Sequence, residues 1–223
     1  MDHSFSPKQH TSDDDDHGFF SVETPMRLDA FVMDDATKIE LIEKNFKDIM
    51  HILGLDLKDD SLKNTPNRVA KMFVKEIFSG LNPDNKPKVS LFENKYGFQH
   101  MLVEKNIRVQ SHCEHHFVPI IGTAAIGYIP KNKVVGLSKL NRIVEYYARR
   151  PQVQERLTMQ IAEELKNMLD TEDVAVLLDA EHLCVTMRGI RDHESRTITS
   201  SYSGKFLDMS TRNEFLQYVG KKD

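Results

Sequence analysis

Two cysteines, each close to a histidine, place the strongest constraint on how this chain can fold. The only two are Cys113, in the segment Cys113-Glu114-His115-His116, and Cys184, which lies two positions after His182. Thiolates and imidazoles are typical zinc ligands, and a fold that joins both segments supplies three ligands while leaving a fourth position open. A catalytic zinc holds water there and lowers its pKa to about 7. The pattern predicts a zinc hydrolase or deaminase-like enzyme, although composition alone is equally compatible with a buried cysteine pair or one disulfide.

The charge balance narrows the class of partner. A net charge of -4 without a basic block is unfavourable for nonspecific nucleic-acid binding, so an anionic ligand needs a few well-placed cations. The N-terminus carries the acidic run 13–16 instead of a basic and apolar leader, and no segment approaches the roughly 20 apolar residues of a membrane span. We expect no nucleic-acid partner, no membrane partner and a cytoplasmic location, where thiols stay reduced.

Hydrophobic periodicity predicts one domain with an N-terminal extension. Residues 1–34 are polar and without an apolar period, which indicates a flexible or loosely docked acidic tail. Helical spacing begins at Ala36 and stops at Gly54, and a second helix begins with Thr65 as its cap and ends at Gly80. We expect a domain over 35–223, with helices in 35–82 and the catalytic part in 89–223.

The rest of the sequence predicts strands and helices in pairs. Strand patterns cover 100–111, 117–129, 174–186 and 197–205, and helical patterns cover 138–147, 152–169 and 210–219. Strands that follow each other by short connections pair antiparallel, so we expect an α+β fold with an antiparallel sheet backed by helices. Exposed edges of so small a sheet need covering, which favours an oligomer.

With these residues in view, the chain resembles GTP cyclohydrolase I from about Ala36 to its end. The matching stretches are Thr65-Pro66-Asn67-Arg68-Val69-Ala70-Lys71-Met72, Ser111-His112-Cys113-Glu114-His115-His116-Phe117, Gly136-Leu137-Ser138-Lys139-Leu140, Arg150-Pro151-Gln152-Val153-Gln154-Glu155-Arg156-Leu157 and His182-Leu183-Cys184-Val185-Thr186-Met187-Arg188-Gly189. The resemblance implies a T-fold with an N-terminal helical pair. It also implies sheets joined between subunits into a barrel, a homodecamer and active sites at subunit interfaces.

The resemblance further implies a zinc-dependent enzyme that converts GTP and water into 7,8-dihydroneopterin triphosphate and formate, the first step of pterin and tetrahydrofolate synthesis. The matching positions make Cys113, His116 and Cys184 the zinc ligands. His115 and His182 become the proton carriers, His115 at the purine nitrogen and His182 in the ribose rearrangement, because histidine titrates near neutral pH. The alternative is that these two histidines only orient a ligand. We expect His112 to be structural.

The resemblance assigns the remaining candidates to GTP. Glu155, with Gln154 beside it, matches the carboxylate that holds guanine, and Glu114 is a weaker candidate for a supporting acceptor. Without the resemblance, Glu155 would be an ordinary acid near a helix start. The matching phosphate ligands are Lys139, Arg142 and Arg188, to which Ser138 adds a hydroxyl at a helix cap, and a neighbouring subunit supplies Arg68 and Lys71. By pattern alone, the last two would be solvated helix charges.

Two alternative functions share the expected fold. One is a T-fold binding protein without catalysis. The other is a T-fold nitrile reductase, which uses a nucleophilic cysteine and no metal. The joint presence of Cys113, His116 and Cys184 argues against the reductase.

Overall fold

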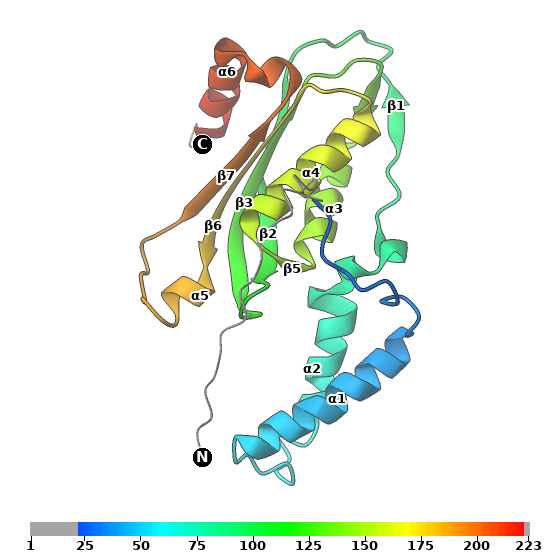
Figure 1. Ribbon diagram of the computed structural model, residues 1–223. Helices are drawn as coiled ribbons and strands as arrows, with labels where there is room; N and C mark the ends of the chain where they lie inside the picture. The colour runs from blue at the N-terminus through cyan, green and yellow to red at the C-terminus, as the bar shows by residue number, and fades with distance from the viewer. Residues whose placement is uncertain (1–21, 221–223) are drawn as a thin grey trace, which may run out of the picture.

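The computed structural model describes residues 22–220, so the predicted flexibility of residues 1–21 lies outside the described residues (Figure 1). The helices are α1 (Asp35–Ile52), α2 (Thr65–Met72), α3 (Leu137–Ala148), α4 (Gln154–Leu169), α5 (Leu183–Thr186) and α6 (Met209–Gly220). Shorter helical segments are η1 (Phe73–Ile77), η2 (Ser79–Leu81), η3 (Pro83–Asn85) and η4 (Gly204–Leu207). The strands are β1 (Leu91–Glu93), β2 (Leu102–Cys113), β3 (Pro119–Tyr128), β4 (Lys133–Val135), β5 (Pro151–Gln152), β6 (Val174–His182) and β7 (Thr197–Tyr202).

A five-stranded sheet in the order β5-β2-β3-β6-β7 forms the frame of the molecule. The pairs β2-β3, β3-β6 and β6-β7 are antiparallel, which confirms the predicted α+β class. The short strand β5 pairs parallel with the end of β2 and was not expected from the sequence. Nor were β1 and β4, which form a separate two-stranded sheet.

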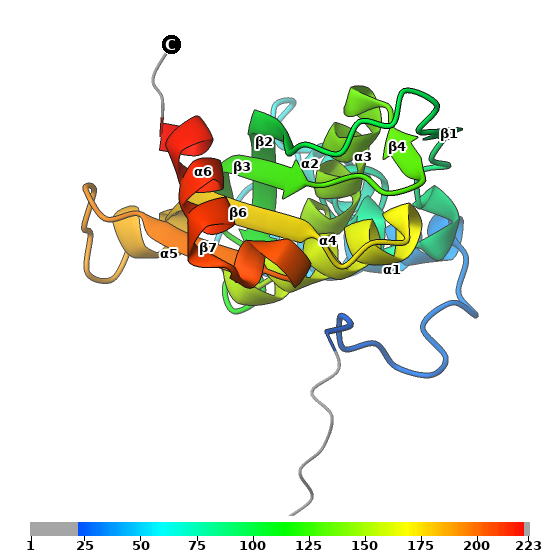
Figure 2. The ribbon, with the colours of Figure 1, turned by 90° about the horizontal axis from the view of Figure 1, so that it is seen from above.

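Alternating side chains of the sheet build two hydrophobic layers. On β3, Ala124, Ile126 and Tyr128 pack with α3 and α4, whereas Ala125, together with Ile129 just after the strand, packs with Phe206 and Phe215 of the C-terminal segment. This two-residue period follows from the pleat of a strand. Figure 1 accordingly shows α3 and α4 against one face and α6 beside β7, and Figure 2 shows the same separation from above.

The N-terminal helices pack as a pair away from the sheet (Figure 1). Helix α1 begins after Asp34, whose carboxylate accepts a hydrogen bond from the Thr37 amide at 2.7 Å, as an N-cap does. Helix α2 differs from the prediction, because Asn64 is the N-cap residue and Thr65 is the first helical residue. After Met72, α2 passes into the π-helical segment η1 instead of continuing regularly to Gly80.

Residues 22–24 are tied to the domain by a chain of buried amides. The Gln160 side-chain amide donates to the Val22 carbonyl at 2.9 Å, and the Gln160 side-chain carbonyl accepts from Gln152 at 2.7 Å. The Arg150 guanidinium lies over the rings of Tyr146 and Tyr147 and donates to Thr24 Oγ1 at 3.3 Å. This N-terminal strap, residues 22–24, therefore belongs to the folded domain although it precedes the predicted boundary at residue 34.

Two further segment ends differ from the prediction. Strand β6 ends at His182, and the next four residues form α5, so Cys184 lies in a short helix and not in a strand. Strand β7 ends at Tyr202 instead of residue 205, because η4 begins at Gly204. None of the helices within residues 22–220 combines the length and the apolar character that crossing a membrane requires.

Candidate metal centre and active site

The connection between β2 and β3 is a tight loop that carries three of the five predicted metal-binding and proton-carrying residues. Cys113 is the last residue of β2, and the Phe117 amide donates to its carbonyl at 2.8 Å. The Cys113 amide in turn donates to the Val118 carbonyl at 2.9 Å. These bonds turn the side chains of His115 and His116 back toward Cys113. The Cys113 sulfur lies 3.6 Å from His115 Nδ1 and 3.9 Å from His116 Nδ1.

The second sulfur, that of Cys184, follows strand β6 and reaches the Cys113 loop through strand register. Ile120 of β3 is paired with His182 of β6, so the short helix α5 begins beside the Cys113 loop. Cys184 packs against the small hydrophobic cluster of Cys113, Ile120 and Ala180. The ligand atoms of Cys113, His116 and Cys184 all lie within 4.8 Å of one another. The structure thus brings together the three predicted metal ligands.

The three ligand atoms suit a zinc ion. Both cysteines are free, Cys113 is buried, and Cys184 is half-buried. Burial, followed by the neighbouring Cys113 thiol, raises the pKa of the Cys184 thiol, so a nearby cation is needed to hold both sulfurs as thiolates. Two thiolates and one imidazole within this distance form a set that zinc prefers, with a fourth position available.

An ion pair that the sequence analysis did not identify fixes the loop to α4. Arg156 donates to both carboxylate oxygens of Glu114, at 2.6 and 3.3 Å, and this contact lowers the pKa of Glu114. The Glu114 amide donates to the Gln152 carbonyl at 3.0 Å. His115 Nε2 lies 3.9 Å from Glu114 Oε1. Glu114 therefore accepts from Arg156 and lies near His115, and no local pattern in the sequence predicts this pairing across 42 positions.

The Gln154 side chain faces strands β6 and β7, whereas the sequence predicts it beside Glu155 at the guanine. This side chain is buried and does not project with Glu155 toward solvent. The Gln154 side-chain nitrogen donates to the carbonyl oxygens of Leu178 and Thr197 and to Thr199 Oγ1. Its side-chain oxygen lies 2.7 Å from His182 Nε2, so it accepts the hydrogen bond from that nitrogen. The amide is fully engaged, which leaves it no group to offer to guanine in this conformation.

The charge of Glu155 acts on His182. Burial lowers the pKa of His182, while the charge of Glu155 opposes that shift, so the two side chains interact. Glu155 itself is exposed in the first turn of α4. His112, in contrast, points away into a half-buried position where Phe78 contacts its ring and burial lowers its pKa. These surroundings suit the structural role expected for His112.

The cations predicted to bind phosphate lie in three separate places. Arg188 donates from Nη1 to His116 Nε2 at 3.1 Å and is thus at the metal centre. Ser138, Lys139 and Arg142 lie in the first half of α3, which begins after β4, whereas the end of α3 leads toward the Cys113 loop through β5. Ser138 is not a cap: Gly136 is the N-cap residue, and Ser138 is the second helical residue. Arg68 and Lys71 are exposed on α2.

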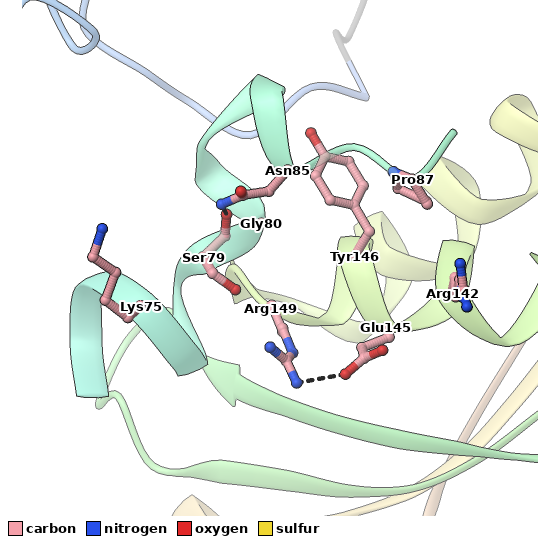
Figure 3. Close-up of a pocket in the computed structure, with 9 residues that line it drawn as sticks. All are labelled: Lys75, Ser79, Gly80, Asn85, Pro87, Arg142, Glu145, Tyr146 and Arg149. Atoms are coloured by element: carbon pink, nitrogen blue, oxygen red, sulfur yellow. Dashed lines mark hydrogen bonds and ion pairs between the residues drawn. The ribbon is translucent and has the colours of Figure 1, made fainter. Parts of the chain in front are cut away.

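Arg142 lines a pocket of about 370 Å³ between α3 and the segment η1–η2 (Figure 3). Lys75 and Arg149 also line it, and Arg149 is paired with Glu145. The Cys113 loop does not line this pocket. Within the described residues, Arg142 thus lies at a pocket that neither cysteine lines.

Comparison of the sequence with known proteins identifies a family. The family model for GTP cyclohydrolase I matches residues 42–220. A protein of Flavobacterium johnsoniae named GTP cyclohydrolase 1 is 60% identical over 205 residues, which cover 92% of this chain and 92% of that protein. The Escherichia coli K12 protein of the same name is 52% identical over 199 residues, 89% of this chain and 90% of that protein.

Among solved structures, part of the chain is similar to the archaeosine synthase QueF-Like in the apo form. The TM-score is 0.40 and the identity 18%, over 47% of this chain and 93% of that chain. The match to the family model and the two bacterial relatives span most of the sequence, including both cysteine segments and the helices that carry the cations. The chain belongs to the GTP cyclohydrolase I family.

Proposed function

We propose that this protein converts GTP and water into 7,8-dihydroneopterin triphosphate and formate. The observation that supports this most is the cluster of Cys113, His116 and Cys184, with His115 and His182 beside it, in a chain of this family. Incubation with GTP should release one formate per pterin formed, in protein that holds about one zinc per chain. Zinc without formate would favour the binding protein, and absence of zinc would favour the nitrile reductase.

Cys113, His116 and Cys184 would hold the zinc. When bound, zinc supplies a Lewis acid that activates water near neutral pH for attack on C8 of guanine. His116 faces Cys113 with Nδ1, and an imidazole that gives Nδ1 to a metal carries its proton on Nε2. Arg188 then loses its acceptor on His116 and is free to bind a phosphate oxygen. Because both sulfurs must stay reduced, we propose a cytoplasmic location.

His115 and His182 would move the protons that ring opening requires. His115 is exposed next to Cys113 and can reach a purine nitrogen held over the centre. His182 donates through Nε2 to Gln154, so its Nδ1 is the atom left to exchange a proton with substrate. We assign Gln154 to the orientation of His182 instead of to guanine.

Replacing Gln154 by Ala tests that assignment. The His182 ring loses the acceptor that fixes it, and we expect kcat to fall about 10- to 100-fold, with a much smaller change in KM for GTP. Steady-state kinetics on formate release measure both constants. Asn167→Ala, which removes an exposed amide from the same helix, is the control and should leave both constants unchanged. A raised KM with an unchanged kcat would contradict this assignment and show that Gln154 binds guanine.

Glu155 would hold guanine, and cations from more than one subunit would hold the triphosphate. A carboxylate accepts hydrogen bonds from N1–H and the 2-amino group of guanine, which adenine lacks. The phosphate-binding candidates on α3 (the hydroxyl of Ser138 and the cations Lys139 and Arg142) and the cations on α2 (Arg68 and Lys71) lie on other elements than the Cys113 loop. We therefore propose that neighbouring subunits of a ring-shaped homo-oligomer, a decamer in this family, bring them to one site.

Mixing two inactive variants tests the shared site. Cys184→Ser removes a metal ligand, and Arg142→Ala removes a phosphate ligand. In oligomers reassembled from an equal mixture, about a quarter of the shared sites combine an intact metal centre with an intact Arg142 from the neighbour. We expect formate release to recover to about that fraction of wild type. A mixture that stays as inactive as its components would place both residues in sites built within one chain.

A further inference from the structure

An unusual helical turn lies directly behind the loop that carries the metal ligands. In the π-helical segment η1, the Phe78 amide donates to the Phe73 carbonyl at 3.1 Å, five residues back. The wider turn places the rings of Phe73 and Phe78 with their centroids 5.4 Å apart. Single π-helical turns are rare and occur frequently at functional sites. Here the turn presents two adjacent aromatic rings to the neighbouring loop.

Phe117 receives those two rings. Its ring centroid lies 4.9 Å from Phe78 and 6.3 Å from Phe73, both close to edge-on, a favoured geometry for aromatic pairs. Phe78 also contacts the His112 ring at 5.7 Å, so one aromatic cluster grips the loop from both of its ends. We call Phe73, Phe78 and Phe117 the aromatic clamp.

The backbone of Phe117 needs such support. Its φ is +54°, in the left-handed region that a bulky side chain rarely occupies. In this conformation its amide donates to the Cys113 carbonyl and closes the loop that contains His115 and His116. The ring is 47% exposed, so burial in a core does not explain why it is held there. Its contacts with the two rings of η1 do.

We propose that Phe117 is a positioning residue for the metal centre. Within the aromatic clamp, Phe73 and Phe78 hold the Phe117 ring. Phe117 in turn holds the left-handed turn that orients the Cys113 sulfur and His116 Nδ1 toward Cys184. The proposal rests on the metal role of these three ligands given above. It also makes the N-terminal helical pair part of the metal site, because η1 is the direct continuation of α2.

Zinc affinity in competition with a chromogenic chelator tests the proposal without using activity. We expect Phe117→Ala to weaken zinc binding about 10- to 100-fold, as loss of a residue that orients a ligand does. Phe117→Gly should weaken it as much, although glycine accepts a positive φ freely. Phe117→Tyr, which keeps the ring, should bind zinc like the wild type. Cobalt-substituted protein should show an altered visible spectrum in the first two variants only.

Controls separate the clamp from general damage. Phe78→Ala should reproduce the loss, and adding it to Phe117→Ala should cost little more, because the two act through one contact. Phe98→Ala removes a ring of similar exposure that contacts His100 at 5.7 Å, outside the clamp, and should not change zinc affinity. Wild-type affinity in both Phe117→Ala and Phe117→Gly, or in Phe117→Gly alone, overturns the proposal. Wild-type protein that binds no zinc refutes the proposed function as well.

Discussion

Cys184→Ser is expected to lose nearly all bound zinc and to release formate at least about a thousandfold more slowly than wild type. The estimate follows from losing a Lewis acid that contributes several kcal/mol to transition-state stabilisation. Serine is close to cysteine in size, so the packing of Cys184 against Ile120 and Ala180 changes little. Metal analysis and a formate assay on the same preparation measure both effects.

The same variant should keep its assembly. The described helices and the five-stranded sheet have hydrophobic layers of their own and do not need the ion to form. Native elution mass and thermal unfolding should therefore stay close to those of wild type. Val185→Ala, which trims the next side chain of α5, is a matched control that should keep its zinc. Dissociation of Cys184→Ser into monomers would show that the metal is structural.

Glu155→Gln is expected to weaken GTP binding by as much as about 10⁴-fold while leaving the unfolding temperature nearly unchanged. Glutamine keeps the size of the side chain but replaces one acceptor by a donor, which then faces a donor of guanine. Because Glu155 is exposed, the substitution disturbs no packing in the described chain. Equilibrium binding of GTP and thermal unfolding measure the two quantities.

Glu163→Gln provides the comparison on the same helix. Glu163 is also exposed and pairs with Lys166 at 2.6 Å. Its replacement by glutamine therefore removes one negative charge from α4, as Glu155→Gln does, but about two helical turns further along. It should bind GTP like the wild type. Near-normal affinity in Glu155→Gln would show that another group holds the guanine.

Much of the fold and the metal set could be predicted because the signals are local. Helical period and strand patterns place the main elements to within a few residues, and the histidines next to each cysteine, together with the family resemblance, favour a metal over a buried pair or a disulfide. The end of β6 could not be predicted in this way. Val185 and Thr186 are β-branched and favour a strand. The structure instead has a helical turn here, in which Cys184 packs against Cys113, Ile120 and Ala180.

The role of Gln154 depends on contacts that no local pattern contains. Gln154 and Glu155 are neighbours in sequence, but adjacent helical residues point in directions about 100° apart. One side chain therefore faces β6 and β7 while the other faces solvent. Only Gln154 donates hydrogen bonds to carbonyls of two strands. The carbonyls that accept them lie more than twenty residues further along the chain. The sequence likewise does not reveal that Arg142 lines a pocket to which the Cys113 loop does not contribute.

The strap at residues 22–24 is linked to the Cys113 loop through buried amides. Val22 binds Gln160, Gln160 binds Gln152, and Gln152 is paired with Cys113 through the backbone. The side chains of Gln160 and Gln152 thus connect the strap to the strand pair that ends at Cys113. A substitution that displaced the strap would therefore leave the buried Gln160 amide without its acceptors, beside the strand pair that carries Cys113.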